Sequence, residues 1–217
     1  MDRLISIIGP AIPQTLIMVF ASTFIAIVLG LPLGVILTIT RKDGLCQNLK
    51  IYSVLDKIIN ILRSFPFIIL VIVVFPLSRI LVGKAYGTAA MIIPLSISAA
   101  PFVARLMEGY FNQIDKGIIE AAKSVGSTNM QIIIRVLIPE AMPMIVNGIT
   151  MTLINVVGYS AMAGAIGGGG LGDIAIRYGY QMRDEVILWS TVVLIILIVQ
   201  IVQVIGNRIE KKIDRRF

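Results

Sequence analysis

The chain has 217 residues, of which 57% are hydrophobic and only 14% are charged, and its mean hydropathy is +0.94. Soluble domains carry about 25% charged residues and disordered chains carry few apolar ones, so both classes are excluded and a membrane protein is indicated. The net charge is +7, with one cysteine and no histidine. An internal disulfide, a histidine-based metal site and a Ser-His-Asp triad are therefore also excluded.

Stretches without charge mark the predicted membrane helices, because about 20 apolar residues are needed to cross the hydrocarbon core. The N-terminal segment lacks the pattern of a cleavable signal peptide. Gly30, Pro32 and Gly34 predict a kink in the first span. The second span has to start near Ile58, which places Arg63 close to one end, where its side chain can reach the membrane surface. The five predicted spans are residues 14–40, 58–80, 85–105, 143–166 and 186–207.

The distribution of basic residues predicts the orientation of these spans. If segments 41–63 and 105–140 and the tail from 208 share one side, that side holds 14 of the 19 Lys and Arg residues. The positive-inside rule makes it the cytoplasmic side, with the N-terminus outside and the C-terminus inside. The basic charge is then a topology signal and not a sign of nucleic-acid binding. We expect an all-α integral membrane protein with one domain, residues 1–217, in which Arg105 anchors the third span at the cytoplasmic surface.

The longest polar region, residues 107–142, lies between the third and fourth spans and predicts two short helices. Apolar residues recur at helical spacing at Ile118, Ala121, Ala122 and Val125. Gly126 is placed to end the first helix in a left-handed conformation. Thr128 and Gln131 form a capping-box pattern at the start of the second helix, residues 129–138, which meets Pro139. Such short helices need a partner surface, because neither is stable alone in water.

The same region resembles the EAA signature of ABC-importer permeases. The match consists of Glu120-Ala121-Ala122, Gly126 after three further residues, and 136–139, which read Val-Leu-Ile-Pro in place of the usual Ile-x-Leu-Pro ending. In that family the motif forms a coupling helix that docks into a groove of an ATPase subunit, a helix-in-groove contact. The resemblance implies ATPase-coupling roles for Glu120, Ala121, Ala122, Val125, Gly126 and Pro139.

Segments 63–70, 99–105, 158–162, 167–172 and 178–180 are further similar to permeases of the methionine-importer family. This resemblance, over about residues 13–210, implies the type I ABC-importer fold in a bacterial cytoplasmic (inner) membrane. It also implies a homodimer with two ATPase subunits and an extracytoplasmic methionine-binding protein. ATP and Mg²⁺ would be bound by the ATPase, and this chain would need no cofactor or metal and would not be an enzyme.

Polar residues of the fourth span are candidates for a translocation path or gate, because polar groups in a span prefer protein or water to lipid. They are Asn155, Tyr159, Ser160 and Met162. Hydrogen bonding between helices and packing by methionine are the alternatives. The glycine-rich run 167–170 is either a flexible outer loop or a closely packed re-entrant segment. Candidate contacts with a binding protein follow at Arg177, Tyr178, Arg183 and Asp184, where solvated surface is the alternative.

Other functions are weighed against the same residues. The span centres carry no ionisable group, which argues against a proton-coupled transporter and a membrane enzyme. No Walker A motif is present, so ATP energy has to come from another chain. A passive channel does not explain the EAA signature. An ABC permease for another small solute, such as a different amino acid or a phosphonate-like anion, remains the alternative to methionine import.

Overall fold

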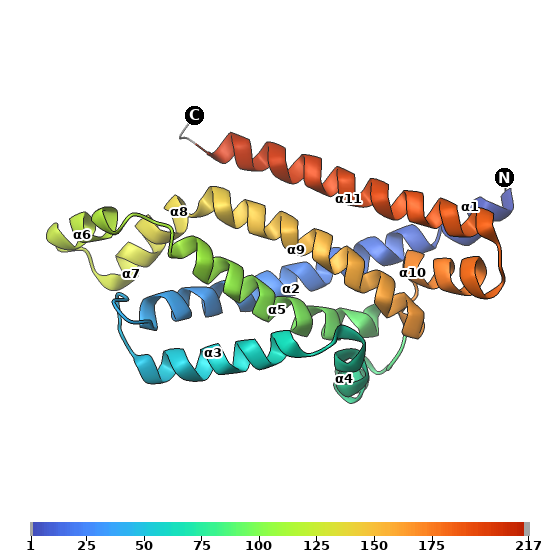
Figure 1. Ribbon diagram of the computed structural model, residues 1–217, viewed down its shortest axis with the longest axis horizontal. Helices are drawn as coiled ribbons and strands as arrows, with labels where there is room; N and C mark the ends of the chain where they lie inside the picture. The colour runs from blue at the N-terminus through green and yellow to red at the C-terminus, as the bar shows by residue number, and fades with distance from the viewer. Residues whose placement is uncertain (1, 215–217) are drawn as a thin grey trace.

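The computed structural model describes residues 2–214, and within them the chain is helical, without a β-strand (Figure 1). Three long helices, α2 (Ala11–Thr40), α9 (Met142–Ala163) and α11 (Glu185–Ile213), run lengthwise through the bundle together with α5 (Thr88–Phe111). The short helix α1 (Asp2–Ile8) precedes α2. The N-terminal end of the described chain and the end of α11 lie at opposite ends of the molecule, as five crossings require.

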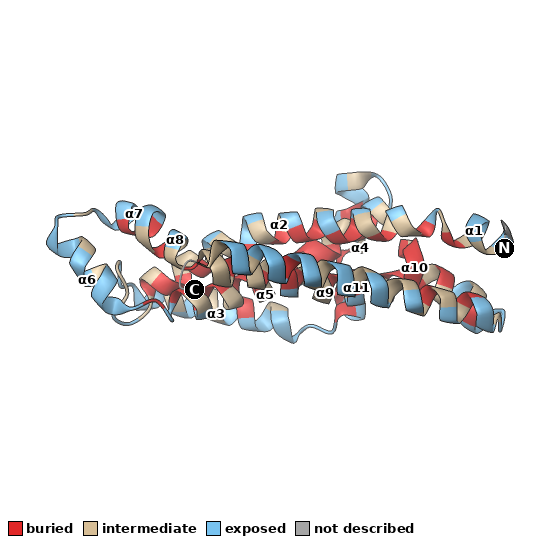
Figure 2. Ribbon diagram, turned by 90° about the horizontal axis from the view of Figure 1, so that it is seen from above, coloured by how far each residue is buried: buried red, intermediate tan, exposed pale blue. Residues whose placement is uncertain are grey.

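Four helical segments are long and apolar enough to cross a membrane, namely Arg3–Thr40, Thr88–Phe111, Met142–Gly168 and Glu185–Ile213. They overlap the predicted spans 14–40, 85–105, 143–166 and 186–207. Their outward faces are exposed over much of the bundle (Figure 2). Those faces carry large apolar side chains, such as Trp189, Val193 and Leu197 of α11. Exposed apolar residues in such number fit contact with lipid and not with water.

The predicted span 58–80 is not one straight helix. Its residues belong to α3 (Leu49–Ser64) and α4 (Phe67–Val82), which meet at an angle of 107°. Phe65 and Pro66 are both extended at the junction, because the residue before a proline is kept out of the helical region. Together the pair can form the fifth crossing, as a broken span.

The core of the bundle is centred on the contact between α2 and α5, the most extensive helix pair in the structure. Gly30 and Gly34 of α2 face α5 at close range. A Cβ atom at Gly34 would lie 2.5 Å from the Cβ of Met107 and 2.8 Å from the carbonyl oxygen of Ala104. Small residues four apart are the usual means by which membrane helices approach closely. α2 continues as a helix through Pro32, so the glycines expected at a kink serve this contact.

Four short helical segments connect α5 to α9 at one end of the bundle (Figure 1). They are α6 (Lys116–Ser124), α7 (Asn129–Ile132), the π-helical turn η1 (Ile133–Leu137) and α8 (Ile138–Glu140). The C-terminal end of α11 lies toward the same end. This grouping agrees with the shared side that the basic residues predict.

The connection from α9 to α11 occupies the other end and folds back on α2. It consists of the π-helical turn η2 (Gly164–Gly168), helix α10 (Gly170–Ile174) and the π-helical turn η3 (Ala175–Gln181). A second apolar cluster joins this region to α1 and α11 through Ile8, Leu171, Ile174 and Ile187. The glycine-rich run is therefore part of the packed structure.

Candidate coupling loop and translocation path

The first helix of the coupling loop, α6, is built as an exposed projection. The Asp115 carboxylate caps its start by accepting a hydrogen bond from the Gly117 N–H at 2.7 Å. None of the residues of α6 is buried. The side chain of Val125, directly after it, is 81% exposed. An amphipathic helix with its apolar residues in the open is suited to dock onto another protein.

The turn after α6 has the predicted geometry. Gly126 adopts φ +80°, and the Ser127 N–H donates to the Ala122 carbonyl at 3.1 Å. The left-handed conformation is accessible to glycine without the steric penalty that a Cβ brings. The Thr128 hydroxyl then accepts from the Gln131 N–H, and the Gln131 side chain accepts from the Thr128 N–H. Both the left-handed Gly126 and the capping box are confirmed.

The sequence predicts that the second helix ends before Pro139. In the structure the helical path continues, and Pro139 lies within α8. Proline has no N–H to donate to the carbonyl four residues earlier, and its ring crowds that carbonyl. The chain adjusts by widening into the turn η1, in which the Ile138 N–H donates to the Ile133 carbonyl. A single π-turn of this kind lets the helix pass the proline without breaking.

Glu120 is exposed and lies at the side of α6 that borders the body of the protein. It lines a cavity of about 100 Å³ between α6 and the loop after α2, together with Arg41 and Lys123. The loop after α2 also contacts α7, because the Asn129 side-chain amide donates to the Leu45 carbonyl at 3.5 Å. The coupling loop is therefore held to α2 as well as to α5 and α9.

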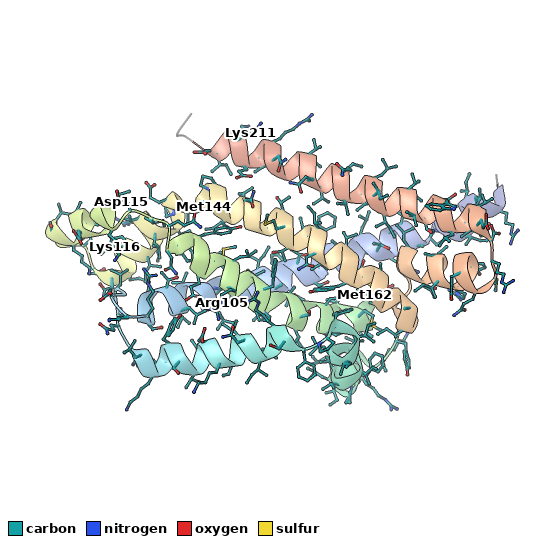
Figure 3. All side chains as sticks on the ribbon, viewed as in Figure 1. Arg105, Asp115, Lys116, Met144, Met162 and Lys211 are labelled. Carbon is teal, nitrogen blue, oxygen red and sulfur yellow. The ribbon has the colours of Figure 1, made fainter. Side chains whose placement is uncertain are left out.

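The four candidate path residues of α9 do not share one environment. The Tyr159 ring stacks on Phe67 of α4 with 4.8 Å between ring centres. The Ser160 hydroxyl is buried and donates to the Val157 carbonyl at 2.8 Å, within its own helix. Asn155 is half-buried, whereas the Met162 side chain is 47% exposed near the end of α9 remote from the coupling loop (Figure 3). Of the four, Ser160 is buried, whereas Asn155, Tyr159 and Met162 keep exposed surface.

The glycine-rich segment is a closely packed one, held by two side chains of α2 that the sequence did not single out. The Gln14 side-chain oxygen accepts from the Gly170 N–H, and the Thr15 hydroxyl accepts from the Leu171 N–H, both at 2.8 Å. These N–H groups are among those left without partners at the start of a helix. Gln14 and Thr15 thus cap α10 from a distance of 156 residues in sequence.

We expect Thr15→Val to destabilise the permease. Valine has nearly the same shape but leaves the buried Leu171 N–H without an acceptor, which costs about 1–3 kcal/mol. Thr38→Val is the matched control, because the buried Thr38 hydroxyl bonds only to the Gly34 carbonyl of its own helix. Unfolding in a denaturing detergent titration should begin earlier for Thr15→Val than for Thr38→Val. Equal transitions would contradict the capping role.

The candidate outer contacts differ in how far their side chains are buried or bound to other residues of this chain. Asp184 is engaged, because it caps α11 by accepting from the Ile187 N–H at 3.2 Å and pairs with Arg3 at 3.4 Å. Tyr178 is half-buried and packs against the second apolar cluster. Arg177 and Arg183 are exposed, although Arg177 also forms an ion pair with Asp173. The two arginines are the members of the set most open to a partner.

Arg105, expected to anchor the third span at the membrane surface, instead lies between α5 and α3 (Figure 3). It forms ion pairs with Asp56 and Glu108, each at 2.6 Å. Its partner on α3 is 49 residues away in sequence, so no local pattern indicates this contact.

Comparison with known proteins places this arrangement in a family. A sequence model described as binding-protein-dependent transport system inner membrane component matches residues 30–217. A probable D-methionine transport system permease protein of Vibrio cholerae is 49% identical over 203 residues, which are 94% of this chain and 90% of the relative. A methionine import system permease protein of Bacillus subtilis is 45% identical over 181 residues, 83% of this chain and 82% of the relative.

Solved structures agree with these relatives. A chain of the MetNI methionine ABC transporter in an inward-facing conformation superposes with a TM-score of 0.97, at 42% identity, covering 99% of this chain and 100% of that chain. An amino acid ABC transporter at 20% identity, with a TM-score of 0.74, shares the fold. The predicted type I ABC-importer permease fold is confirmed. The chain belongs to the family of binding-protein-dependent transport system inner membrane components.

Proposed function

We propose that the chain is the permease subunit of an ABC importer that carries methionine across the bacterial cytoplasmic membrane. The observation that carries this proposal is the near-complete structural match to the permease chain of a methionine ABC transporter, at 42% identity. Relatives from both Vibrio and Bacillus, which are named for methionine transport, support the same substrate. The chain translocates its substrate and performs no covalent chemistry itself.

The complete importer contains two copies of this permease, two ATPase subunits and an extracytoplasmic methionine-binding protein. ATP and Mg²⁺ are held by the ATPase subunits, and this chain requires no cofactor of its own. No group of three or more Asp, Glu, Cys or His side chains suited to a metal occurs within residues 2–214. The bilayer covers the apolar outer faces of the bundle.

The coupling loop is the proposed contact with the ATPase. Its exposed helix α6, residues Ala121, Ala122 and Val125 above all, docks into a groove on the ATPase surface. Glu120 is exposed beside them and supplies a charge for the contact, and Pro139 lies in α8, where the loop rejoins the bundle. Gly126 fixes the direction in which the chain leaves α6 and returns toward α7.

Transport proceeds by alternating access. Closure of the ATPase subunits on ATP moves the coupling loops, and the helices of the two permeases tilt to open the path outward. The binding protein then delivers methionine at the outer surface, where Arg177 and Arg183 are the proposed contacts. Asn155, Tyr159 and Met162 line the path, and hydrolysis restores the inward-facing state.

The test is a competition panel in vesicles that hold the whole reconstituted complex. Uptake of radiolabelled L-methionine should require ATP and the binding protein. An excess of unlabelled methionine should abolish it, whereas other amino acids and a small phosphonate should not. Uptake that a phosphonate or an unrelated amino acid suppresses equally would assign the permease to that solute.

We expect Met162→Trp to slow uptake without preventing assembly. The larger ring would obstruct a path at this exposed position, and a reduction of about tenfold corresponds to about 1.4 kcal/mol on the barrier. Leu197→Trp is the matched control, because Leu197 is 50% exposed on the outer, lipid-facing side of α11 and lies outside both the proposed path and the proposed binding-protein contact. Initial uptake rates per assembled complex give the comparison. Wild-type uptake by Met162→Trp would remove Met162 from the path.

A further inference from the structure

A polar network joins α3 to α5 near the end of the bundle that carries the coupling loop. The Arg105 guanidinium of α5 donates to Asp56 and to Glu108 at 2.6 Å, and to the Asn60 side-chain oxygen at 2.9 Å. The Tyr52 hydroxyl donates to the second carboxylate oxygen of Glu108 at 3.2 Å. Tyr52, Asp56 and Asn60 are spaced four apart, so they share one face of α3.

This network attaches α3 to α5 alongside a small apolar cluster. α3 buries only one of its residues, Ile59, which packs against Leu37 and Ala104. The Glu108 side chain, in contrast, is only 6% exposed. A buried carboxylate needs its charge partner, because an unpaired charge in that position is strongly unfavourable. The position of α3 relative to α5 is therefore set by Arg105 together with apolar packing, to which Leu55 also contributes.

The network lies between two parts of the proposed machinery. In one direction, α5 ends at Phe111, four residues before Asp115 caps the coupling helix α6. In the other direction, α3 ends at the 107° bend and continues into α4. The first residue of α4, Phe67, stacks on Tyr159 of the proposed path. α5 also packs directly on α4 and α9. A displacement of α5 reaches the path through α3 as well when α3 and α5 move together.

We propose that Arg105, together with Asp56 and Glu108, is a set of positioning residues that makes α3 follow α5 during the transport cycle. The ion pairs convey the motion of the coupling loop to the α3–α4 bend, and so to Phe67 and Tyr159. This inference rests on the proposed function, since it takes the coupling loop as the contact with the ATPase.

The test uses the complete importer in vesicles and measures methionine taken up per ATP hydrolysed. Asp56→Ala removes the carboxylate of α3 and leaves the Arg105–Glu108 pair intact. The ratio should fall by at least about fivefold, the lower end of typical couplings between sites, while the amount of assembled complex and its ATP hydrolysis persist. Asp56→Glu should retain most of the ratio, and Lys57→Ala, at the exposed neighbouring position of α3, should keep all of it.

A wild-type ratio in Asp56→Ala would overturn the proposal, and so would parallel losses of uptake and hydrolysis that follow the loss of assembled complex. If Asp56→Ala does not assemble, Tyr52→Phe decides, because it removes only the hydroxyl bond to Glu108. A lowered ratio is expected for it, and a wild-type ratio would refute the positioning role. The variant Gly126→Val separates this failure from that of the premise, since its normal coupling would remove the coupling-loop assignment itself.

Discussion

Gly126→Val is expected to uncouple ATP hydrolysis from transport while the permease still inserts and binds its partner. Gly126 adopts φ +80°, a conformation that costs a residue with a Cβ about 1–2 kcal/mol and a β-branched one more. No atom lies within 4 Å of the position that a Cβ would take, so the effect comes from the backbone and not from a clash. The turn between α6 and α7 would shift to relieve the strain and change the direction of the docked helix.

Two companion variants make this result specific. Gly126→Asn should retain coupling, because asparagine tolerates the left-handed conformation better than other residues. Gly109→Val introduces the same side chain at a helical glycine that also has open space around it, and it should behave as wild type. The measurement is ATP hydrolysis with and without binding protein and methionine, in reconstituted vesicles. Normal stimulation of hydrolysis in Gly126→Val would contradict the assignment of this turn.

Gly34→Val is expected to prevent correct folding. The added Cβ would lie 2.5 Å from the Cβ of Met107 and 2.8 Å from the Ala104 carbonyl oxygen, so α2 and α5 would have to move apart. Overpacking a well-packed core costs about 1–3 kcal/mol, and more where a backbone cannot shift. Because this contact is the most extensive helix pair of the bundle, the loss should appear as a low yield of folded protein.

The yield of monodisperse protein after detergent extraction, together with its thermal transition, measures that loss. Gly34→Ala should show a smaller defect of the same kind, because it adds only the Cβ. Gly109→Val again serves as the control, since it adds a valine where nothing lies within 4 Å. A yield and a transition like those of wild type would mean that α2 and α5 can separate without cost.

Local patterns predicted the turn and the capping box of the loop between α5 and α9 correctly, because each of these features lies within a few residues. The capping box joins Thr128 to Gln131, and the left-handed Gly126 follows α6 directly. The match to the EAA signature has the same short range. The local sequence did not predict that the helix continues past Pro139. It continues because the π-turn η1 accommodates a proline that would otherwise end a helix.

The second span shows why the rest could not be predicted. Counting uncharged residues placed its start at Ile58, after Asp56 and Lys57, whereas α3 begins at Leu49. The Asp56 charge within α3 is partly exposed and is paired with Arg105 of a distant helix. A partner 49 residues away leaves no trace in a hydropathy profile. Likewise, nothing near Gln14 indicates that its side chain caps a helix start at Gly170.

The capping of α10 by Gln14 and Thr15 has a consequence for biogenesis. The acceptors are synthesised first, and the N–H groups that they bind follow 156 residues later. At typical synthesis rates of about 5–20 residues per second, α2 waits for roughly 8–31 s before this contact can form. Once the glycine-rich segment has been made, its N–H groups need these acceptors, because lipid cannot satisfy them. Completion of the outer end is therefore a late event in assembly, after the helices of the core have inserted.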